Sequence, residues 1–544
     1  MTKLETCNIA ARLARWAQEM PDTSAMIEMR SGFRRTFNEL ERESNRLASG
    51  MIQSGMQPGE RVLLMVPYGI DFVTLTFAMF KAGLIPVLID PGLGKKNVLK
   101  CIQQVQPQGM IAIPLVHAIK KFLPGTFKSI QHSVTVGKRW FWGGNTLNKL
   151  RDLGKADFEM AAMKEDHPAA ILFTSGSTGP AKGVLYNHGI FNHQVRILQE
   201  QFDIQSGEID LPTFPLFGLF GSGLGMTSII PDMDATQPAR VDPQNIIRPI
   251  NEYKITSSFG SPALWDTVSK YCLEKNIQLP SLKRIIMAGA PVSGELLQRF
   301  ETLINKNCKI YTPYGATEVL PVSLIDRREI LDHTWRLSKK GEGICVGRPI
   351  PGVEIKIITI SDQPISKWAE ATKLEKNNVG EITIKAPWAT RAYFNREDLT
   401  QLAKIEDDNS FWHRMGDLGR LDEKNRLWFY GRKNQRVITE NETLYTIPCE
   451  AIFNQHPDVK RSALVGIGPK TKQQPVIIIE PINPEKIKSP TEQQKFTEEL
   501  LERGATTSFT QSIKKILFHS EFPVDVRHNA KIFREKLSLW AENQ

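Results

Sequence analysis

Short apolar runs alternate with longer amphipathic stretches along most of this chain. Val62–Val66 and Pro86–Ile89 have the length and composition of buried strands, and Asp71–Lys81 between them has the length of a helix. Gly109–Pro114 repeats the strand pattern. Strands that alternate with helices predict sheets covered by helices. The pattern therefore indicates an α/β fold for the first part of the chain.

The pattern changes after Arg432. A charged segment, Lys433–Glu442, precedes a helix that we expect to begin at Pro448, and Val459–Gly468 and Val476–Glu480 then predict short strands. A chain of 544 residues is too long for one hydrophobic core. We therefore predict a large multi-sheet N-terminal domain, residues 1–432, and a small mobile α+β C-terminal domain, residues 433–544.

Composition excludes several classes of protein. Apolar and charged residues make up 41% and 24% of the chain, as in an ordinary globular protein. The net charge of +10 comes from scattered basic residues, so we expect anionic substrates and no nucleic acid. Six widely spaced cysteines predict free thiols, and the N-terminus lacks the apolar core of a secretory signal. We therefore expect a cytoplasmic protein.

Two apolar features invite a membrane interpretation. The most apolar region, Val62–Ile89, is interrupted by prolines and charged residues and does not predict a span. Trp140–Trp142 are three consecutive aromatic residues before two glycines. We expect them to pack in a core or a folded loop, with contact to a membrane or a partner as the alternative.

One loop carries most of the candidate chemistry. The apolar run Ala169–Phe173 stops before a cluster of glycines and hydroxyl residues that ends near Lys182. Glycines let backbone N–H groups converge on an anion, hydroxyls add neutral donors, and the lysine adds a charge. A kinase-type or GTPase-type P-loop is excluded, because Gly183 and a strand follow the lysine instead of a hydroxyl and a helix. The predicted polyphosphate loop, for which a plain connector is the alternative, comprises Thr174, Ser175, Gly176, Ser177, Thr178, Gly179 and Lys182.

This loop resembles the phosphate loop of the adenylate-forming superfamily, which includes acyl-CoA synthetases, adenylation domains of nonribosomal peptide synthesis and luciferases. Three further motifs of that family follow in its order. They are Tyr314–Glu318, the pair Gly416–Gly419 with Gly431–Arg432, and Asn529–Ile532. Four ordered motifs over nearly the whole chain identify it as similar to that superfamily.

The resemblance implies that ATP and Mg²⁺ are cofactors and assigns roles to individual residues. Lys182 and the rest of the loop would hold the β- and γ-phosphates. Thr317 would donate to the α-phosphate, and Glu318 with Thr174 would bind Mg²⁺. Lys531 would bridge the ribose and the substrate carboxylate. The remaining nucleotide contacts would come from Gly289, Ala290, Pro291, Tyr314, Gly315, Asp417 and Arg432.

Each of these residues has a purely structural alternative when it is considered alone. Glu318 would then be a surface ion pair, Asp417 and Gly289–Pro291 would be turn residues, and Lys531 would be a solvent-exposed lysine. The surrounding motifs favour the functional interpretation of Glu318 and Asp417.

Two departures from the superfamily bear on the second half-reaction. In CoA ligases a Gly-rich turn after the domain boundary lines the tunnel for the thiol, but here Asn434–Pro448 contains no glycine. Gly218 stands where many CoA ligases carry a histidine. These departures resemble the β-lactone synthetases of bacterial long-chain olefin biosynthesis, as do the segments Leu88–Gly92, Val184–Phe191 and Arg527–Glu535.

This second resemblance implies a long-chain 3-hydroxy fatty acid as the substrate, whose own hydroxyl displaces AMP and closes a β-lactone. It also implies association with other proteins of olefin biosynthesis or with a membrane surface. A long-chain acyl-CoA ligase, which would use CoA, is one alternative, and a non-catalytic acyl- or nucleotide-binding protein is another. His188 and His193 are candidate acceptors for the hydroxyl proton, without an assignment. The acyl chain would contact Phe214, Phe217, Gly218 and Phe220, for which a buried Gly-rich turn is the alternative.

Overall fold

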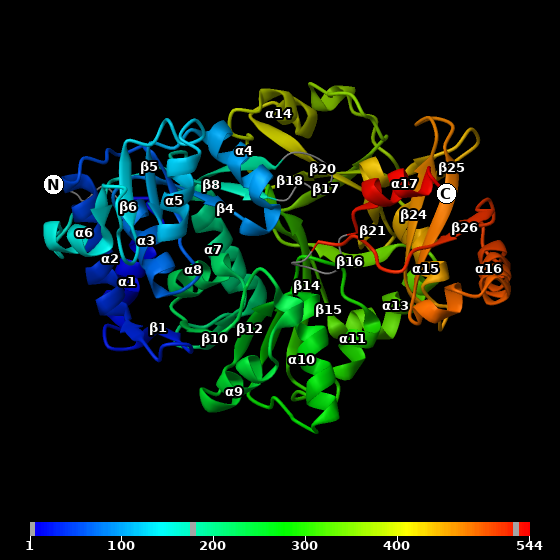
Figure 1. Cartoon of the computed structure of the whole chain (residues 1–544), viewed down its shortest axis with the longest axis horizontal. Helices are drawn as coiled ribbons and strands as arrows, with labels where there is room; N and C mark the ends of the chain where they lie inside the picture. Colours follow the sequence, from blue (N-terminus) through cyan, green and yellow to red (C-terminus); the bar gives the residue numbers. More distant parts are fainter. Residues whose placement is uncertain (1–5, 175–180, 526–531) are drawn as a thin grey trace.

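Two large β-sheets form the N-terminal part of the chain (Figure 1). The computed structural model describes residues 6–174, 181–525 and 532–544. The smaller of the two has seven strands in the order β7-β6-β5-β3-β4-β8-β9, all parallel except the last pair. Its strands are β3 Arg61–Met65, β4 Ile85–Ile89, β5 Gly109–Ala112, β6 His132–Thr135, β7 Asn145–Thr146, β8 Pro168–Thr174 and β9 Lys182–Asn187.

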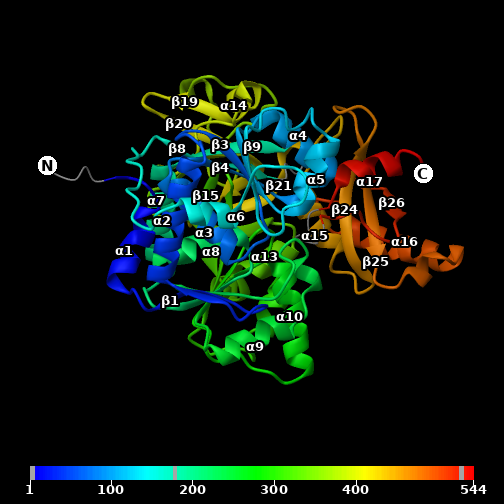
Figure 2. The same ribbon diagram turned by 60° about the vertical axis from the view of Figure 1, so that its left-hand side comes forward.

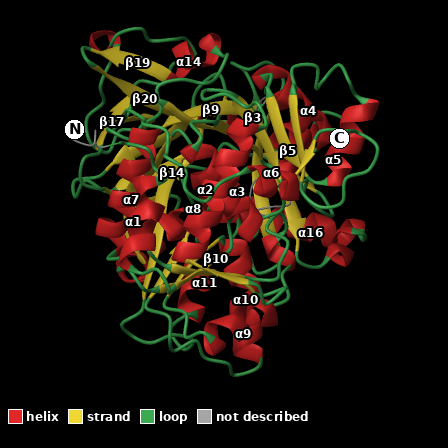
Figure 3. Cartoon of the chain, turned by 90° about the vertical axis from the view of Figure 1, so that its left-hand side faces the viewer, coloured by secondary structure: helices red, strands yellow, loops and turns green. Residues whose placement is uncertain are grey.

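Helices connect and cover these strands, as the alternating sequence pattern predicts (Figure 3). The expected helix at Asp71–Lys81 is α3, and its apolar residues are buried almost all round because it packs between the sheet and α2. Even the Lys81 side chain is buried, and its Nζ lies 2.6 Å from the Glu41 carboxylate. The helices of this half are α1 Ala11–Glu19, α2 Phe37–Gln53, α3 Ile70–Lys81, α4 Lys95–Val105, α5 Pro114–Phe122, α6 Leu147–Leu153 and α7 His188–Phe202.

The larger sheet has fourteen strands, and the pairing of its strands changes from parallel to antiparallel in the middle. One end, from β1 and β11 through β10, β12, β13 and β14, is parallel, and the strands beyond β14 pair antiparallel. The turn between β14 and β15, where this change occurs, contains Thr317 and Glu318. The strands are β1 Ser24–Glu28, β2 Arg34–Thr36, β10 Ile209–Pro212, β11 Thr227–Ile230, β12 Ser257–Gly260, β13 Arg284–Met287, β14 Lys309–Ala316, β15 Val319–Asp326, β16 Ile344–Pro349, β17 Glu354–Ile358, β18 Gly380–Lys385, β19 Lys404–Asp407, β20 Ser410–Leu421 and β21 Leu427–Arg432.

The segment between β10 and β11 is a helix, α8, although it contains three glycines. Sequence reasoning predicted either an acyl channel or a buried turn here. Pro215 occupies the first helical position, where its missing N–H is no loss. Gly218 and Gly221 are buried because Tyr68 and Ser228 fill the space beside them. The helices of this half are α8 Pro215–Leu224, α9 Gln244–Glu252, α10 Pro262–Glu274, α11 Gly294–Arg299, α12 Arg327–Glu329, α13 Trp335–Lys339 and α14 Glu397–Ala403.

The residues after Arg432 pack around their own small sheet (Figure 2). Its order is β24-β25-β26, and two apolar clusters drawn from residues 437–541 cover its two faces. The predicted helix begins at Thr446, two residues before Pro448, because proline is tolerated in the first helical turn. The elements are β22 Val437–Ile438, β23 Thr443–Leu444, α15 Thr446–Phe453, β24 Val459–Ile467, β25 Gln474–Pro481, α16 Pro490–Ala505, β26 Lys515–Phe518 and α17 Arg534–Ala541.

The aromatic run Trp140–Trp142 is only partly packed. Trp142 stacks on the His117 ring, with 5.6 Å between the ring centroids. Trp140 and Phe141 are 59% and 76% exposed. The prediction that this run packs inside the protein is therefore wrong for two of its three residues.

Two sequence-based expectations concern the chain as a whole. All six cysteines are free thiols, as their spacing predicts. Among the residues that the structure describes, no helix combines the length and the apolar character needed to cross a bilayer.

A buried ion-pair network lies where β21 passes into the C-terminal part. Glu381 on β18 accepts from Arg414 on β20 at 2.7 Å and pairs with Lys433 at 2.9 Å. The Glu381 and Arg414 side chains are each 1% exposed. Lys433 is the first residue after β21, so this carboxylate fixes the start of the connection between the two parts.

Replacement of Glu381 tests this network. Glu381→Ala leaves Arg414 buried without a counter-charge, which we expect to lower the free energy of unfolding by about 3–5 kcal/mol. The exposed pair Glu485–Lys488 provides a matched control, because Lys488→Ala should change stability by less than about 0.5 kcal/mol. Thermal unfolding followed by circular dichroism measures both, and equal midpoints would contradict the prediction.

Candidate active site

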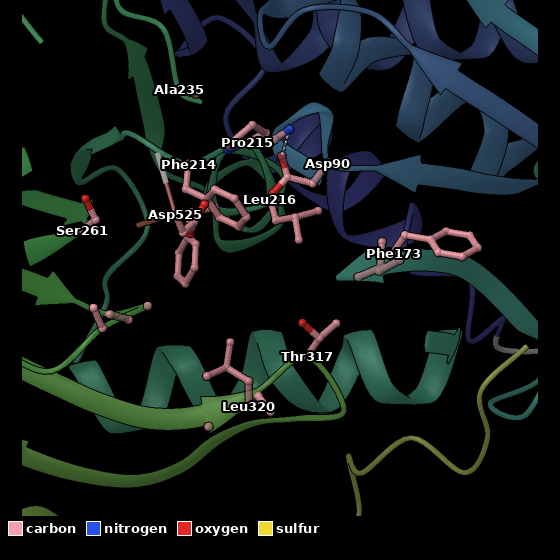
Figure 4. Close-up of a pocket in the computed structure, with 18 of the residues that line it drawn as sticks. Asp90, Phe173, Phe214, Pro215, Leu216, Ala235, Ser261, Thr317, Leu320 and Asp525 are labelled. Atoms are coloured by element: carbon pink, nitrogen blue, oxygen red, sulfur yellow. Dashed lines mark hydrogen bonds between the residues drawn. The ribbon is translucent and has the colours of Figure 1, made fainter. Parts of the chain in front are cut away.

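One cavity of about 2010 Å³ brings the candidate motifs together (Figure 4). It is larger than pockets for drug-sized molecules, which span about 300–1,000 Å³. In Figure 4 Thr317 and Leu320 lie across this cavity from Phe214 and Leu216. The sequence-predicted residues that line it are Lys182, Phe214, Phe217, Phe220, Gly289, Ala290, Pro291, Tyr314, Gly315, Thr317, Glu318, Asp417 and Arg432.

Asp417 is the centre of the polar end of this cavity. Arg432 Nη1 lies 2.8 Å from its Oδ1, and Tyr314 Oη donates to its Oδ2 at 2.6 Å. Burial raises the pKa of Asp417, and the charge of Arg432 and the Tyr314 hydrogen bond oppose that rise. The Asp417 charge in turn raises the pKa of Arg432. A carboxylate held in this way can accept hydrogen bonds from the two hydroxyls of a ribose.

The β20–β21 hairpin sets the distance between Asp417 and Arg432. The two residues are direct cross-strand partners although fifteen positions separate them in sequence. Asp422 holds the turn by accepting from the Lys424 and Arg426 amides. Gly431 has φ of +126°, and a side chain there would collide with Thr446 Oγ1. The sequence motifs Gly416–Asp417 and Gly431–Arg432 therefore lie on the two strands of one hairpin.

Three residues from distant segments hold the turn that carries Thr317 and Glu318. Tyr186 Oη donates to the Thr317 carbonyl at 2.5 Å. Thr390 donates from its amide to the Glu318 carbonyl at 2.8 Å. Tyr393 Oη donates to Glu318 Oε1. Among the described residues, no hydrogen bond or ion pair engages the second carboxylate oxygen of Glu318, and Thr317 lines the cavity.

Lys182 faces the same turn. Its Nζ lies 4.9 Å from the centre of the Tyr393 ring, a cation–π contact. Burial lowers the pKa of Lys182, while the Glu318 charge opposes this shift. Nearby, burial lowers the pKa of Lys404 to about 7, and its Nζ lies 3.0 Å from His413 Nδ1. Two lysine side chains therefore lie where phosphates are expected, and burial disfavours the charged form of each.

Several predicted residues lie outside the part of the chain that the structure describes. These are Ser175, Gly176, Ser177, Thr178 and Gly179 of the phosphate loop and Lys531 near the C-terminus. Thr174 is the last residue of β8. The residues on either side of both segments line the cavity: Phe173, Ala181, Asp525 and Ile532.

The described residues fit a magnesium ion that is bound mainly by substrate phosphates. Among them no group of three or more His, Cys, Asp or Glu side chains could hold a metal. Mg²⁺ in phosphate-transfer sites commonly uses one or two carboxylates and takes its other ligands from phosphates and water. Glu318 supplies such a carboxylate beside Lys182.

The apolar end of the cavity extends between α3, α7 and α8. Phe217 stacks on Phe259 with 3.4 Å between ring centroids, and Phe220 packs edge-on against Phe191 at 6.4 Å. Gly218 lies behind these rings, where the Tyr68 hydroxyl fills the place of its missing side chain. The apolar lining comprises Ile9, Phe72, Phe77, Phe80, Phe191, Val195, Phe217, Phe220 and Gly223.

Sequence reasoning missed the residues that hold the site from outside its motifs. Tyr186, Tyr393, Thr390 and Lys404 had no recognisable pattern, because their partners are remote in sequence. The two candidate histidines are engaged by the backbone. His188 Nδ1 accepts from the Ile9 amide at 3.2 Å, and His193 Nδ1 lies 2.9 Å from the Gly189 carbonyl.

Comparisons with known proteins agree with this geometry. The model of a family described as AMP-binding enzyme matches residues 13–394. An olefin β-lactone synthetase from Xanthomonas campestris pv. campestris is 43% identical, over 99% of this chain and 98% of that protein. One from Stenotrophomonas maltophilia is 41% identical, over 98% of both. An O-succinylbenzoate coenzyme A synthetase from Bacillus subtilis, solved with AMP, shares the fold with a TM-score of 0.75, 22% identity and 97% coverage of both chains.

Asp417→Asn tests the nucleotide end. The substitution keeps the shape of the side chain but removes the charge that faces Arg432, so we expect ATP to bind about 10- to 100-fold more weakly. Tyr314→Phe removes one donor and leaves the carboxylate, and its effect should be smaller. Equilibrium binding of ATP measures both variants, and wild-type affinity in Asp417→Asn would remove this residue from the site.

Proposed function

The chain belongs to the AMP-binding enzyme family, and from that membership we propose that it converts a long-chain 3-hydroxy fatty acid into a β-lactone. The enzyme is adenylate-forming and splits ATP into AMP and pyrophosphate. The observation that carries the proposal is the single cavity, which joins a polar end built on Asp417 and Arg432 to a long apolar end.

In the first step the substrate carboxylate attacks the α-phosphorus of ATP. The bond to pyrophosphate breaks, and an acyl-adenylate forms. Asp417 and Arg432 would position the ribose, Thr317 would donate to the α-phosphate, and Lys182 would stabilise the departing charge. Mg²⁺, held by Glu318 and the phosphates, would neutralise the phosphate charge.

In the second step the 3-hydroxyl oxygen attacks the acyl carbon of the adenylate. The bond from that carbon to AMP breaks, the hydroxyl proton is released, and a four-membered lactone closes. Ring strain opposes closure, but a tethered nucleophile can reach an effective molarity of about 10⁵ M or more. Both the nucleophile and the leaving group are already bound in the cavity, so no second substrate has to enter.

The apolar end of the cavity supports a long alkyl chain. Phenylalanines of α3 and α8 line it, and Gly223 leaves space beside Val195 on α7. Burial of an alkyl chain contributes about 0.8 kcal/mol per CH₂ group. Affinity should therefore rise with chain length until the cavity is filled.

The segment that follows the domain boundary favours lactone closure over thioester formation. Asn434–Pro448 has no glycine. Val437–Ile438 and Thr443–Leu444 form a small hairpin, and Thr439 closes its turn by accepting from the Asn441 and Glu442 amides. A long-chain acyl-CoA ligase is the alternative, and it needs a path for CoA past this hairpin.

We propose a cytoplasmic site of action, since six free thiols suit a reducing compartment. Other proteins of olefin biosynthesis are proposed partners, because a strained lactone is a reactive intermediate that a following enzyme would consume.

Product analysis with and without CoA tests the proposed function. Purified protein receives ATP, Mg²⁺ and a long-chain 3-hydroxy acid, and AMP and acyl products are followed. We expect repeated turnover to a β-lactone without CoA. Lys531→Ala is the inactive control, since loss of the proposed bridging charge should abolish pyrophosphate release.

The other outcomes separate the alternatives. AMP release that requires CoA would establish the ligase instead. Absence of pyrophosphate exchange with every acid would indicate a non-catalytic binding protein. Undiminished exchange in Lys531→Ala would exclude that lysine from the mechanism.

A further inference from the structure

Two uncharged polar side chains in the wall of the cavity each carry an atom without a hydrogen-bond partner among the described residues. The atoms are Gln194 Oε1 and Tyr68 Oη, both buried. Buried polar atoms are paired in the great majority of cases, so unpaired ones at a binding cavity point to a ligand.

The orientation of Gln194 is fixed by its amide nitrogen. Nε2 donates to the Leu320 carbonyl at 3.0 Å, and the side chain also bonds the Tyr186 hydroxyl. The whole residue is 3% exposed. With the nitrogen engaged by the Leu320 carbonyl, the oxygen is the atom that remains for a ligand. An amide oxygen only accepts, so the ligand must bring an O–H or N–H donor.

Tyr68 approaches the same apolar end from the turn before α3. Its ring packs edge-on against Phe72, with centroids 6.2 Å apart, and its hydroxyl lies against Gly218 on α8. A side chain at position 218 would collide with this hydroxyl, so the glycine is what admits it. Burial and the nearby Asp210 raise the pKa of Tyr68, which keeps the phenol protonated and able to donate.

The place of Gln194 indicates which part of the ligand it meets. Leu320, which anchors it, is three residues after Thr317, the residue expected at the reacting phosphate. Gln194 Oε1 therefore lies toward the carboxyl end of a bound acid, and Tyr68 lines the same cavity. Neither ATP phosphates nor an ionised carboxylate can donate to Gln194 Oε1. A hydroxyl close to the carboxyl carbon can, and it can also accept from Tyr68.

We propose that Gln194 Oε1 and Tyr68 Oη form the recognition site for the 3-hydroxyl group of the acyl substrate. This inference rests on the proposed function for the identity of the hydroxyl. The two contacts would select hydroxylated acids and point the hydroxyl oxygen at the acyl carbon. They orient the nucleophile and take no proton from it.

Adenylation of paired substrates tests this site separately from lactone closure. Pyrophosphate exchange is measured with a 3-hydroxy acid and with the unsubstituted acid of the same length. Wild type should prefer the hydroxylated acid in kcat/KM. Gln194→Leu and Tyr68→Phe should each reduce that preference about tenfold or more, through weaker use of the hydroxylated acid alone. Val195→Leu, the neighbouring lining position, should affect both acids equally.

The outcomes are distinguishable from failure of the proposed function. If wild type prefers the hydroxylated acid but forms no lactone, the proposed function fails while the recognition site can still be tested. If lactone forms and both variants retain the wild-type preference, the recognition site is overturned. Equal losses for both acids in both variants would also overturn it, because they would indicate a merely structural role.

A second, independent observation concerns charge on the surface around α5. Between Asp90 and Asp152 the sequence has ten basic residues and no acidic one. In the middle of this segment lie exposed apolar side chains of α5 and of the loop beside it. Leu115, Phe122, Trp140 and Phe141 are 65%, 83%, 59% and 76% exposed.

These side chains belong to one face. Trp142 stacks on His117 of α5, so the loop that carries Trp140 and Phe141 packs against that helix. Exposed basic residues flank them, including Lys121, Lys128, Lys138 and Arg139. Val116, between Leu115 and His117, lines the cavity. The face therefore borders the cavity.

We infer that this aromatic and basic face binds the surface of an anionic phospholipid bilayer. Aromatic and aliphatic tips insert between headgroups, and lysines and arginines are attracted to anionic lipids. The segment that carries this face has basic residues and no acidic ones. A uniformly positive surface matches an anionic bilayer better than a protein partner, whose surface would carry charges of both signs. Long-chain acids partition into bilayers, so the contact would place the cavity near its substrate.

Vesicle sedimentation tests this surface with the full-length protein. We expect binding to phosphatidylcholine vesicles that contain phosphatidylglycerol, weaker binding to pure phosphatidylcholine, and release by high salt. The double variant Trp140→Ser with Phe141→Ser should bind about tenfold more weakly. Leu539→Ser, at a similarly exposed leucine of α17, is the matched control.

Two results would overturn this inference. One is equal binding of the double variant and the control. The other is failure of wild type to sediment with anionic vesicles, in which case the face would have to be assigned to a protein partner.

Discussion

The buried carboxylate of Asp417 is the group on which the polar end of the site depends. It is held by Arg432 from the neighbouring strand and by Tyr314 from the next part of the sheet. A buried charge without such partners would be strongly destabilising, so the three residues stabilise one another as a unit. Arg432 is also the last residue of β21, and Lys433 directly after it pairs with Glu381. The nucleotide end and the connection to the C-terminal part therefore share one strand end.

The cavity combines two kinds of environment, and each suits one step of the proposed reaction. In the proposed attack on ATP, Lys182 would neutralise phosphate charge, and the Thr317–Glu318 turn would supply a hydroxyl donor and a carboxylate for Mg²⁺. An apolar end that excludes water serves the second step, because water would otherwise hydrolyse the adenylate. Gln194 and Tyr68 are the polar exceptions in that apolar lining. Their unpaired atoms give the apolar end a preference for a hydroxyl that hydrophobic contacts alone could not provide.

The α/β organisation could be predicted from sequence because its signals are local, and most of the described candidate residues line one cavity. Strand and helix periodicity predicted β3, α3, β4 and β5 within one or two residues, and the six free thiols followed from cysteine spacing. The prediction that Trp140 and Phe141 are packed inside the protein was wrong. Burial of a side chain depends on the segments that pack against it, which the local sequence does not reveal. The Gly-rich α8 was not recognised as a helix, because the residues that fill the space beside its glycines are distant in sequence.

By itself, the sequence determined which residue types are available for chemistry. They are a glycine- and hydroxyl-rich loop that predicts phosphate binding, the acidic residue Glu318, the basic residue Lys182, and the motifs that contain Asp417 and Arg432. Tertiary structure alone decided which of these groups share a cavity and which residues hold them in place. Tyr186, Tyr393 and Gln194 contact the Thr317–Leu320 segment across more than 70 positions of chain. Such contacts join segments that are remote in sequence, and neither local propensity nor residue spacing carries information about them.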